Sequence, residues 1–276
     1  MIPTAFEYTR ATTVADALAA LGNGDGKLLA GGHSLVPALK LRLNQPERLV
    51  DISQIAELRA IREENGGLVI GAAATHNDIA TNPLVRSQLP MFAEGAGLIG
   101  DVQVRNRGTI GGSLAHADPA ADWSAMVLAA GATIAVQGNK GARKIAASDF
   151  FTGIFMTALA EDEIITAVHV PVVAGAKATY QKFPQPASRF AIVGCAAQRT
   201  PDGQVHIAFT GLSDTPHRDH AAEAAVSGKP LDAAAIAAAA AAAGEGVSIN
   251  VDHYASEKYR KHLAKVYVKR ALEAIV

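Results

Sequence analysis

Two glycine-rich segments constrain the fold of this chain more than any other feature. The first reads Leu29-Ala-Gly-Gly-His-Ser-Leu-Val-Pro37 and follows a short apolar stretch that is predicted to be a strand. The second reads Arg105-Asn-Arg-Gly-Thr-Ile-Gly-Gly-Ser-Leu-Ala115. Glycine permits positive φ and close approach of the backbone, so successive N–H groups can surround an anion. Either segment alone fits a tight turn, but the pair predicts a binding site for an anion such as a diphosphate.

The hydrophobic pattern predicts two differently built parts of the chain. Before residue 176, helical and strand patterns alternate, with helices expected over 14–21, 35–43, 84–97 and 120–130 and strands over 132–137 and 164–171. After residue 176, three strands at hairpin spacing are expected over 178–183, 191–199 and 205–211, followed by helices. This change of pattern predicts a separate C-terminal domain.

Charge and cysteine content exclude several classes of function. The formal net charge is −1 and no apolar run is long enough to span a membrane, which argues against nucleic-acid and membrane binders. The chain begins without the basic and apolar segments of a secretory signal, and its single cysteine, Cys195, is expected to be a buried small hydrophobe. A cytoplasmic location fits best. Iron–sulfur clusters generally need four protein ligands, so any such cluster belongs to another chain.

His116, Asp118 and Asp122 offer a possible metal site, because imidazole and carboxylate groups both bind metals. The sequence also allows a structural interpretation, in which Asp118 caps a helix that begins near Ala120 and Asp122 lies in its first turn. We favour the structural interpretation, and we predict no metal ligands in this chain.

Both glycine-rich segments match one known family. Ala30-Gly-Gly-His-Ser34 together with Thr109-Ile-Gly-Gly112 resembles the paired FAD-diphosphate segments of the medium subunits of carbon monoxide dehydrogenase and related flavoproteins of the xanthine oxidase superfamily. The resemblance continues in family order along nearly the whole chain, at 2–8, 49–52, 70–72, 163–165, 180–182 and 259–272. The chain is thus similar to the FAD-binding subunits of molybdenum hydroxylases.

The resemblance implies an α+β fold. Residues 1–175 are expected to form a FAD-binding domain of the vanillyl-alcohol-oxidase (PCMH) type, with subdomains of about 1–55 and 56–175. Residues 176–276 are expected to form a C-terminal domain with a three-stranded antiparallel sheet and helices.

The resemblance also implies roles for individual residues. The glycine-rich segments would hold the FAD diphosphate, Asp122 would accept hydrogen bonds from FAD hydroxyls, and Ile165 would pack on the flavin. Tyr180 and Lys182 would lie near the isoalloxazine ring, where a lysine can stabilise negative charge. No catalytic acid or base is implied. The residues implied to bind FAD are Leu29, Ala30, Gly31, Gly32, His33, Ser34, Leu35, Gly108, Thr109, Ile110, Gly111, Gly112, Ser113, Ala117, Asp122, Ile165, Tyr180 and Lys182.

Two departures from the family pattern affect the expected site. Ser113 stands where many relatives have asparagine, although serine also occurs among them. Residues 184–188 replace part of a charged stretch by Pro184-Gln-Pro-Ala-Ser188. These changes are expected to alter the surroundings of the flavin ring and the acceptor site.

The resemblance implies an electron-transfer subunit of a larger oxidoreductase. A small subunit with [2Fe–2S] clusters would deliver electrons from a large subunit that carries a molybdopterin cofactor, and FAD in this chain would pass them to an external acceptor. The expected assembly is a dimer of heterotrimers, with carbon monoxide, an N-heteroaromatic compound or an aldehyde as substrate. Two alternatives stay open: a self-sufficient FAD oxidase or reductase of the same fold, and a non-catalytic nucleotide-binding scaffold subunit.

Overall fold

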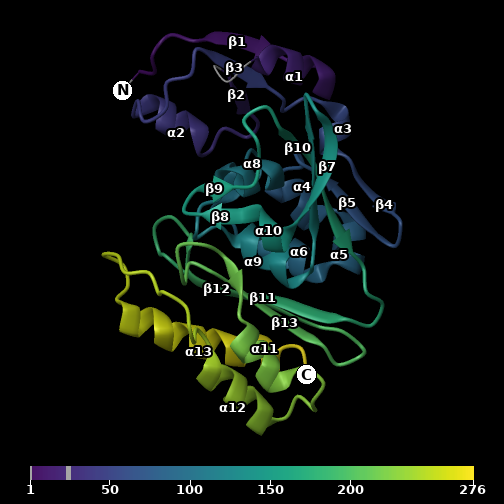
Figure 1. The fold of residues 1–276 in the computed structure, drawn as a ribbon, viewed down its shortest axis with the longest axis vertical. Coiled ribbons are helices and arrows are strands. Elements are labelled where there is room, and N and C mark those ends of the chain that lie inside the picture. The colour runs from purple at the N-terminus through teal and green to yellow at the C-terminus, as the bar shows by residue number, and fades with distance from the viewer. Residues whose placement is uncertain (1, 23–25) are drawn as a thin grey trace.

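The computed structural model describes residues 2–22 and 26–276, which form three units stacked along the longest axis of the molecule (Figure 1). The first unit is a three-stranded parallel sheet in the order β1-β3-β2, with one helix after β1 and another after β2. Its elements are β1 (Glu7–Arg10), α1 (Val14–Leu21), β2 (Gly26–Leu29), α2 (Leu35–Lys40) and β3 (Arg48–Asp51). The predicted helix over 14–21 is confirmed, and a capping box between Thr13 and Asp16 explains where it begins.

The second unit contains an antiparallel sheet in the order β4-β5-β10-β6-β7, packed against a group of short helices. Its strands are β4 (Ile61–Glu64), β5 (Gly67–Gly71), β6 (Thr133–Gly138), β7 (Gly141–Ala146) and β10 (Ile164–Pro171). Its helices are α3 (Ala56–Arg59), α4 (His76–Thr81), α5 (Pro83–Gln88), α6 (Pro90–Gly97), α7 (Val102–Arg105), α8 (Ile110–His116), α9 (Asp122–Ala129) and α10 (Ala147–Phe150). A small hairpin, β8 (Phe151–Gly153) and β9 (Met156–Thr157), follows α10.

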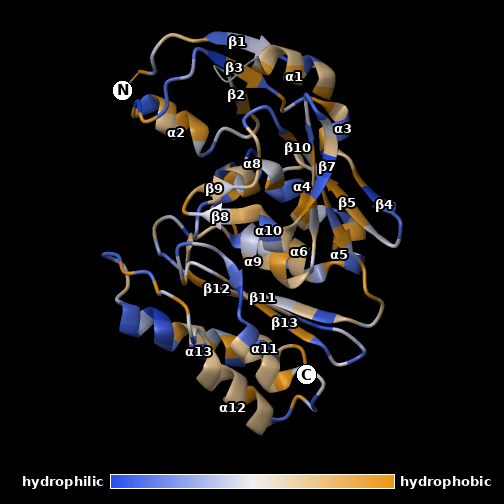
Figure 2. Ribbon diagram, viewed as in Figure 1, coloured by the Kyte–Doolittle hydropathy of each residue, from blue (hydrophilic) through white to orange (hydrophobic). Residues whose placement is uncertain are grey.

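The third unit is an antiparallel sheet covered on both faces. Its elements are β11 (Lys177–Pro184), β12 (Ala191–Arg199), β13 (Val205–Thr210), β14 (His217–Arg218), α11 (His220–Val226), α12 (Ala233–Ala242) and α13 (Glu257–Glu273). Ala196 and Ala208 face the core of the second unit, whereas Cys195 and Phe209 face the core formed with the C-terminal helices. This alternation is the two-residue period of a strand, and it explains why β12 is apolar at nearly every position. Figures 1 and 2 show α12 and α13 covering the side of the sheet that faces away from the second unit.

The structure corrects three details of the expectations. The C-terminal sheet has a fourth strand, the two-residue β14, which was too short to give a hydrophobic pattern. The helix expected over 84–97 is two helices, because Leu89 leaves the helical conformation, with φ −133° and ψ 60°, and Pro90 starts a new helix at its first position. The helix expected from Ala120 starts at Asp122 instead, as α9.

The second glycine-rich segment also differs from a simple loop. Its residues 110–115 lie within α8, and Thr109 caps this helix by accepting a hydrogen bond from the Gly112 N–H. Tertiary packing overrides the low helix propensity of Gly111 and Gly112, since Gly111 lies against Ala72 of the sheet edge. Among the described helices, none combines the length and apolar character that a membrane crossing needs.

Candidate functional site

A cavity of about 500 Å³ lies between the first and second units, and both glycine-rich segments line it. Its volume falls within the range of about 300–1,000 Å³ that is usual for ligand and cofactor sites. The wall combines the β2–α2 connection, the start of α8, the first residues of β10 and residues 188–190 before β12. Segments far apart in the sequence therefore meet at one place.

The first glycine-rich segment passes very close to the second. A Cβ on Gly31 would lie 2.1 Å from the backbone oxygen of Arg107, so only glycine permits this approach. Gly32 has a φ of 75°, a backbone conformation that residues other than glycine rarely adopt. Both glycines are thus required by the geometry where the first and second units meet.

The same segment has several backbone N–H groups without a hydrogen-bond acceptor among the described residues. The backbone N–H groups of Gly31, Gly32, His33 and Ser34 donate to no acceptor among the described residues. Ser34 precedes α2, but its side chain caps no N–H group of that helix. Since these residues line the cavity, the segment offers a row of amide and hydroxyl donors to a ligand.

The second glycine-rich segment is hydrogen-bonded to its neighbours instead. Ile110 N–H donates to Ala74 O at 3.2 Å, and Gly111 N–H donates to Ala72 O at 2.9 Å. The Gly112 N–H is engaged by the Thr109 hydroxyl at 3.1 Å. Of the backbone N–H groups at 108–113, only that of Thr109 has no acceptor among the described residues.

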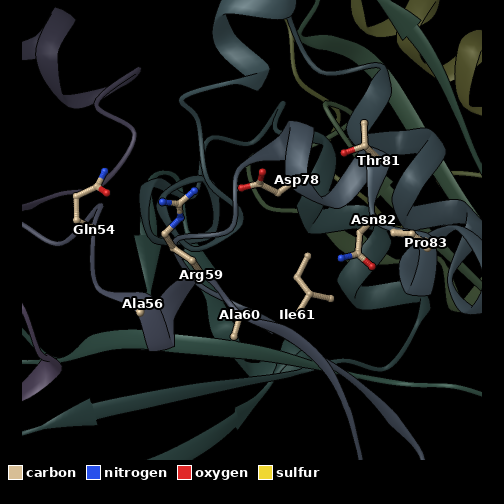
Figure 3. A pocket seen from close by; sticks show the side chains of 9 residues that line it. All are labelled: Gln54, Ala56, Arg59, Ala60, Ile61, Asp78, Thr81, Asn82 and Pro83. Carbon is tan, nitrogen blue, oxygen red and sulfur yellow. The ribbon is translucent and has the colours of Figure 1, made fainter.

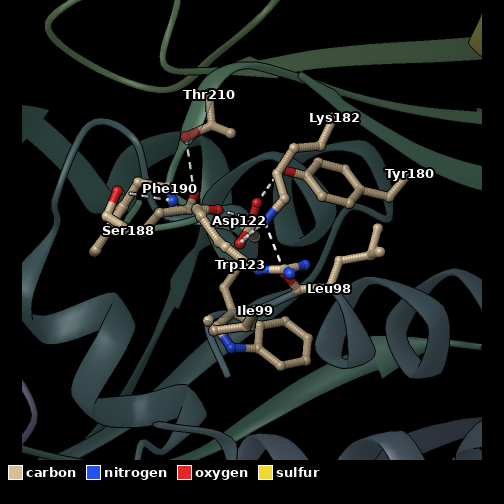
Figure 4. A network of polar contacts seen from close by, with 12 residues as sticks. Leu98, Ile99, Asp122, Trp123, Tyr180, Lys182, Ser188, Phe190 and Thr210 are labelled. Atoms are coloured by element: carbon tan, nitrogen blue, oxygen red, sulfur yellow. Dashed lines mark hydrogen bonds and ion pairs between the residues drawn. The ribbon is translucent and has the colours of Figure 1, made fainter. Parts of the chain in front are cut away.

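Asp122 joins the cavity to the third unit through a buried polar network (Figure 4). Its carboxylate accepts a hydrogen bond from the Tyr180 hydroxyl and another from Lys182 Nζ at 2.9 Å. The side chains of Asp122 and Lys182 are 5% and 3% exposed, so this ion pair is shielded from water. Burial raises the pKa of Asp122, and the Lys182 charge and Tyr180 hydrogen bond oppose that rise.

Lys182 also fixes the segment that closes one side of the cavity. Its ammonium donates to Leu98 O at 2.9 Å and to Arg189 O at 2.8 Å. Arg189 has a positive φ of 61°, and it lines the cavity with Ser188 and Phe190. The departure from the family pattern at 184–188 thus leads directly into the cavity wall.

The residues proposed from the sequence fall into two groups. Members of the cavity wall are Ala30, Gly31, Gly32, His33, Ser34, Leu35, Gly108, Thr109, Gly111, Gly112, Ser113, Asp122 and Ile165. The remaining members lie behind that wall: Leu29 at the end of β2, Ile110 in the core, Ala117 at the left-handed end of α8, and Tyr180 and Lys182 behind Asp122.

Several wall residues were not predicted, among them His76, Glu163, Arg189 and Phe190. His76 is 5% exposed, and burial, aided by the nearby charges of His33 and Arg105, lowers its pKa to about 3. The sequence assigned His76 no role in binding. Its position as the first residue of α4 left no local sign that the ring would reach a cavity.

A second hollow, shown in Figure 3, is a weaker candidate. Its polar side chains include Asp78, which completes the capping box of α4, and Asn82, whose side chain caps α5. These groups have structural partners already. Helix capping thus accounts for these two side chains, and the hollow is lined by neither glycine-rich segment.

The alternative interpretation of His116, Asp118 and Asp122 as metal ligands gains no support from the described residues. Within the described part of the chain, no group of three or more histidine, cysteine or acidic side chains is arranged to hold a metal. Asp118 accepts a hydrogen bond from Ala120 N–H at 2.8 Å, and the ring of His116 lies against that of Phe155. Cys195 is fully buried as predicted, and burial raises the pKa of its thiol.

Comparisons with known proteins cover the whole chain. A family model described as the FAD binding domain in molybdopterin dehydrogenase matches residues 4–173, and one described as the CO dehydrogenase flavoprotein C-terminal domain matches residues 178–275. The carbon monoxide dehydrogenase medium chain of Hydrogenophaga pseudoflava is 42% identical over 281 residues, covering 99% of this chain and 98% of the relative.

A second relative and a solved structure extend this similarity. The glyceraldehyde dehydrogenase medium chain of Sulfolobus acidocaldarius is 35% identical and covers 100% of both chains. A solved structure of the Hydrogenophaga pseudoflava carbon monoxide dehydrogenase aligns with a TM-score of 0.95 and 44% identity, covering 100% of this chain and 98% of that chain.

Proposed function

Because the chain belongs to the FAD-binding medium subunits of the molybdenum hydroxylase family, we propose that its cavity holds FAD with the diphosphate where the two glycine-rich segments meet. The resemblance predicted from the sequence is confirmed by these matches. The fold prediction is confirmed as well. The chain is therefore the FAD-dependent part of an oxidoreductase.

One observation carries the proposal for the diphosphate position. Gly31 touches the backbone of Arg107, and the N–H groups of Gly31 to Ser34 have no acceptor among the described residues. A diphosphate needs several closely spaced donors and a backbone that it can approach without hindrance from Cβ atoms. The residues present fit that requirement.

Asp122 and Lys182 are assigned to the flavin side of the cavity. Both Asp122 oxygens already accept one hydrogen bond, but an ionised carboxylate has further lone pairs for a FAD hydroxyl. Lys182 reaches the cavity only through Asp122 and Arg189, so we assign it the role of holding these two residues in place. Ile165 lines the cavity and is assigned to packing on the flavin ring.

The electron-transfer role follows from the cofactor and from the partners. When bound, FAD can accept electrons one at a time and pass them on singly or in pairs. A single cysteine leaves the [2Fe–2S] clusters to another chain, in agreement with a medium subunit. We propose that this chain takes electrons from that small subunit and delivers them to an external acceptor, within a dimer of heterotrimers in the cytoplasm.

The substrate of the complex is not fixed by this chain. Relatives of similar identity carry names as different as carbon monoxide dehydrogenase and glyceraldehyde dehydrogenase. The substrate reacts at molybdenum in the large subunit, so residues around FAD do not select it. Carbon monoxide, an N-heteroaromatic compound and an aldehyde are all retained as proposals, as is the division into domains at 175/176.

The decisive experiment uses the complex assembled with its small and large subunits. We expect FAD in a one-to-one ratio with this chain, and bleaching of the flavin band after reduction through the iron–sulfur clusters. Flavin that is reduced by substrate without the other subunits would favour a self-sufficient oxidase or reductase. A complex that assembles without any flavin would favour a scaffold subunit and overturn the proposal.

A further inference from the structure

His76 is a buried side chain in the cavity wall that neither the sequence motif nor the proposed function uses. It is the first residue of α4, and its backbone N–H donates to Gly108 O at 2.9 Å. This bond ties α4 to the second glycine-rich segment. The imidazole is 5% exposed and lines the cavity.

Trp123 determines which nitrogen of this imidazole carries the proton. The indole Nε1–H of Trp123 lies 3.0 Å from His76 Nδ1 in a buried hydrogen bond. An indole N–H can only donate, so Nδ1 must be the acceptor and the proton of a neutral ring must reside on Nε2. Trp123 is fully buried and packs against Phe92, so it holds the ring in one orientation.

The Nε2 edge of the ring points toward the second glycine-rich segment. A Cβ on Gly108 would lie 2.7 Å from His76 Nε2, so glycine at this position leaves room for the ring. Nε2 donates to no acceptor among the described residues. A polar side chain that is almost fully buried thus presents an unused donor where the two segments meet.

The imidazole is also a neutral donor near neutral pH. Burial, with the charges of His33 and Arg105, lowers the pKa of His76 to about 3. The ring therefore keeps its Nε2–H without becoming an imidazolium. This matters because, counting acceptors among the described residues, the Thr109 amide alone is free in residues 108–113, whereas the first segment has a row of free amides.

We propose that His76 is a further FAD-positioning residue, whose Nε2–H donates a hydrogen bond to an oxygen of the FAD diphosphate. The inference rests on the proposed function, because it requires FAD in this cavity. The amides at the start of α8 already donate hydrogen bonds within the protein. His76 therefore provides a hydrogen-bond donor to FAD from the second unit. Trp123 acts through His76 by setting its tautomer.

The test compares FAD affinity among variants of the assembled complex after flavin removal. Trp123→Phe serves as the background, because it avoids leaving an unpaired indole N–H when the ring is removed. In that background, we expect His76→Leu to weaken FAD binding by about 10-fold to 100-fold, the range for a hydrogen bond to a charged group. His76→Gln keeps a donor near the Nε2 position, and we expect it to recover most of the affinity.

NMR of the complex, before and after FAD is added, distinguishes a purely structural role of His76 from a direct hydrogen bond to FAD. We expect the ¹⁵N signals of His76 to show the Nε2–H tautomer, and its Nε2 proton to move downfield when FAD is added. The ³¹P resonances of bound FAD should shift in His76→Leu and stay near the wild-type positions in His76→Gln. Thermal midpoints of the flavin-free variants provide the stability control.

The outcomes distinguish the two levels of the proposal. If the wild-type complex takes up no FAD, the proposed function itself is wrong. If the Trp123→Phe parent and both His76 variants made in it bind FAD with equal affinity and identical ³¹P resonances, only the role of His76 is overturned. A fall in thermal midpoint with unchanged ³¹P resonances would also reduce His76 to a structural residue.

Discussion

The two glycine-rich segments have similar compositions but different states in the folded chain. In the first, Gly32 has positive φ and the amides of 31–34 have no acceptor among the described residues. In the second, the amides of Ile110, Gly111 and Gly112 are engaged by the sheet edge and by the Thr109 cap. Glycine in the first segment provides a positive φ, free donors and a close approach to Arg107, whereas glycine in the second segment provides only close packing, against Ala72 and His76. The same motif can therefore serve binding at one place and architecture at another.

The largest effect is expected from Gly31→Ala. A Cβ would lie 2.1 Å from Arg107 O, a backbone atom that cannot move alone. The added methyl group should push the two segments apart and weaken FAD binding by about 100-fold, which corresponds to the upper end of the free-energy cost of overpacking. Gly97→Ala is the matched control, because a Cβ there meets nothing within 4 Å. Equal FAD affinities of the two variants, measured by flavin fluorescence titration, would contradict the close contact.

The pH dependence of stability should reveal the buried His76 beside the second segment. Its folded pKa of about 3 lies below the unfolded value of about 6.5, so the unfolded chain binds more protons between these values. The contribution of the neutral His76 ring to the free energy of unfolding is fully present above the unfolded pKa. It is lost as pH falls, by about 2 kcal/mol from pH 7 to pH 5. Urea unfolding of the full chain measures this loss. His76→Gln should show a flatter profile, and an unchanged profile would mean that His76 is not buried as a neutral ring.

The Thr109 cap should affect stability more than binding. Thr109→Val removes the acceptor of the Gly112 N–H, and loss of an N-cap costs about 1 kcal/mol. We expect a lower urea midpoint for the full chain and a small change in FAD affinity. A large loss of FAD affinity at unchanged stability would show that the second segment binds more directly than its hydrogen bonds indicate.

The opposite pattern is expected for Ser34, which caps no helix amide. Ser34→Ala should change the free energy of unfolding, measured with urea, by no more than about 0.5 kcal/mol, as for surface substitutions without structural partners. FAD affinity should fall by about fivefold, the range for one neutral hydrogen bond. Comparison of this variant with Thr109→Val separates the two segments. Thr109→Val should have the larger effect on stability, and Ser34→Ala should have the larger effect on FAD affinity.

Local pattern was sufficient for much of the fold. The helix over 14–21 and the strands around 133–138, 164–171 and 191–199 were predicted from hydrophobic period alone. The proline at 90 was visible in the sequence, but a break between two apolar helical stretches was not recognised. The fourth strand of the C-terminal sheet has only two residues, which is too few for a period to be read.

The sequence by itself determined which family this chain belongs to, because glycines at fixed places and apolar periods are local properties of the chain. Only the tertiary structure decided which donors are free. The bonds from Gly111 to Ala72, from Trp123 to His76 and from Tyr180 to Asp122 join residues that are distant in sequence. No local pattern encodes such pairs, since a hydrogen bond depends on where two folded segments meet. That is why the two glycine-rich segments are alike in sequence and different in the folded protein.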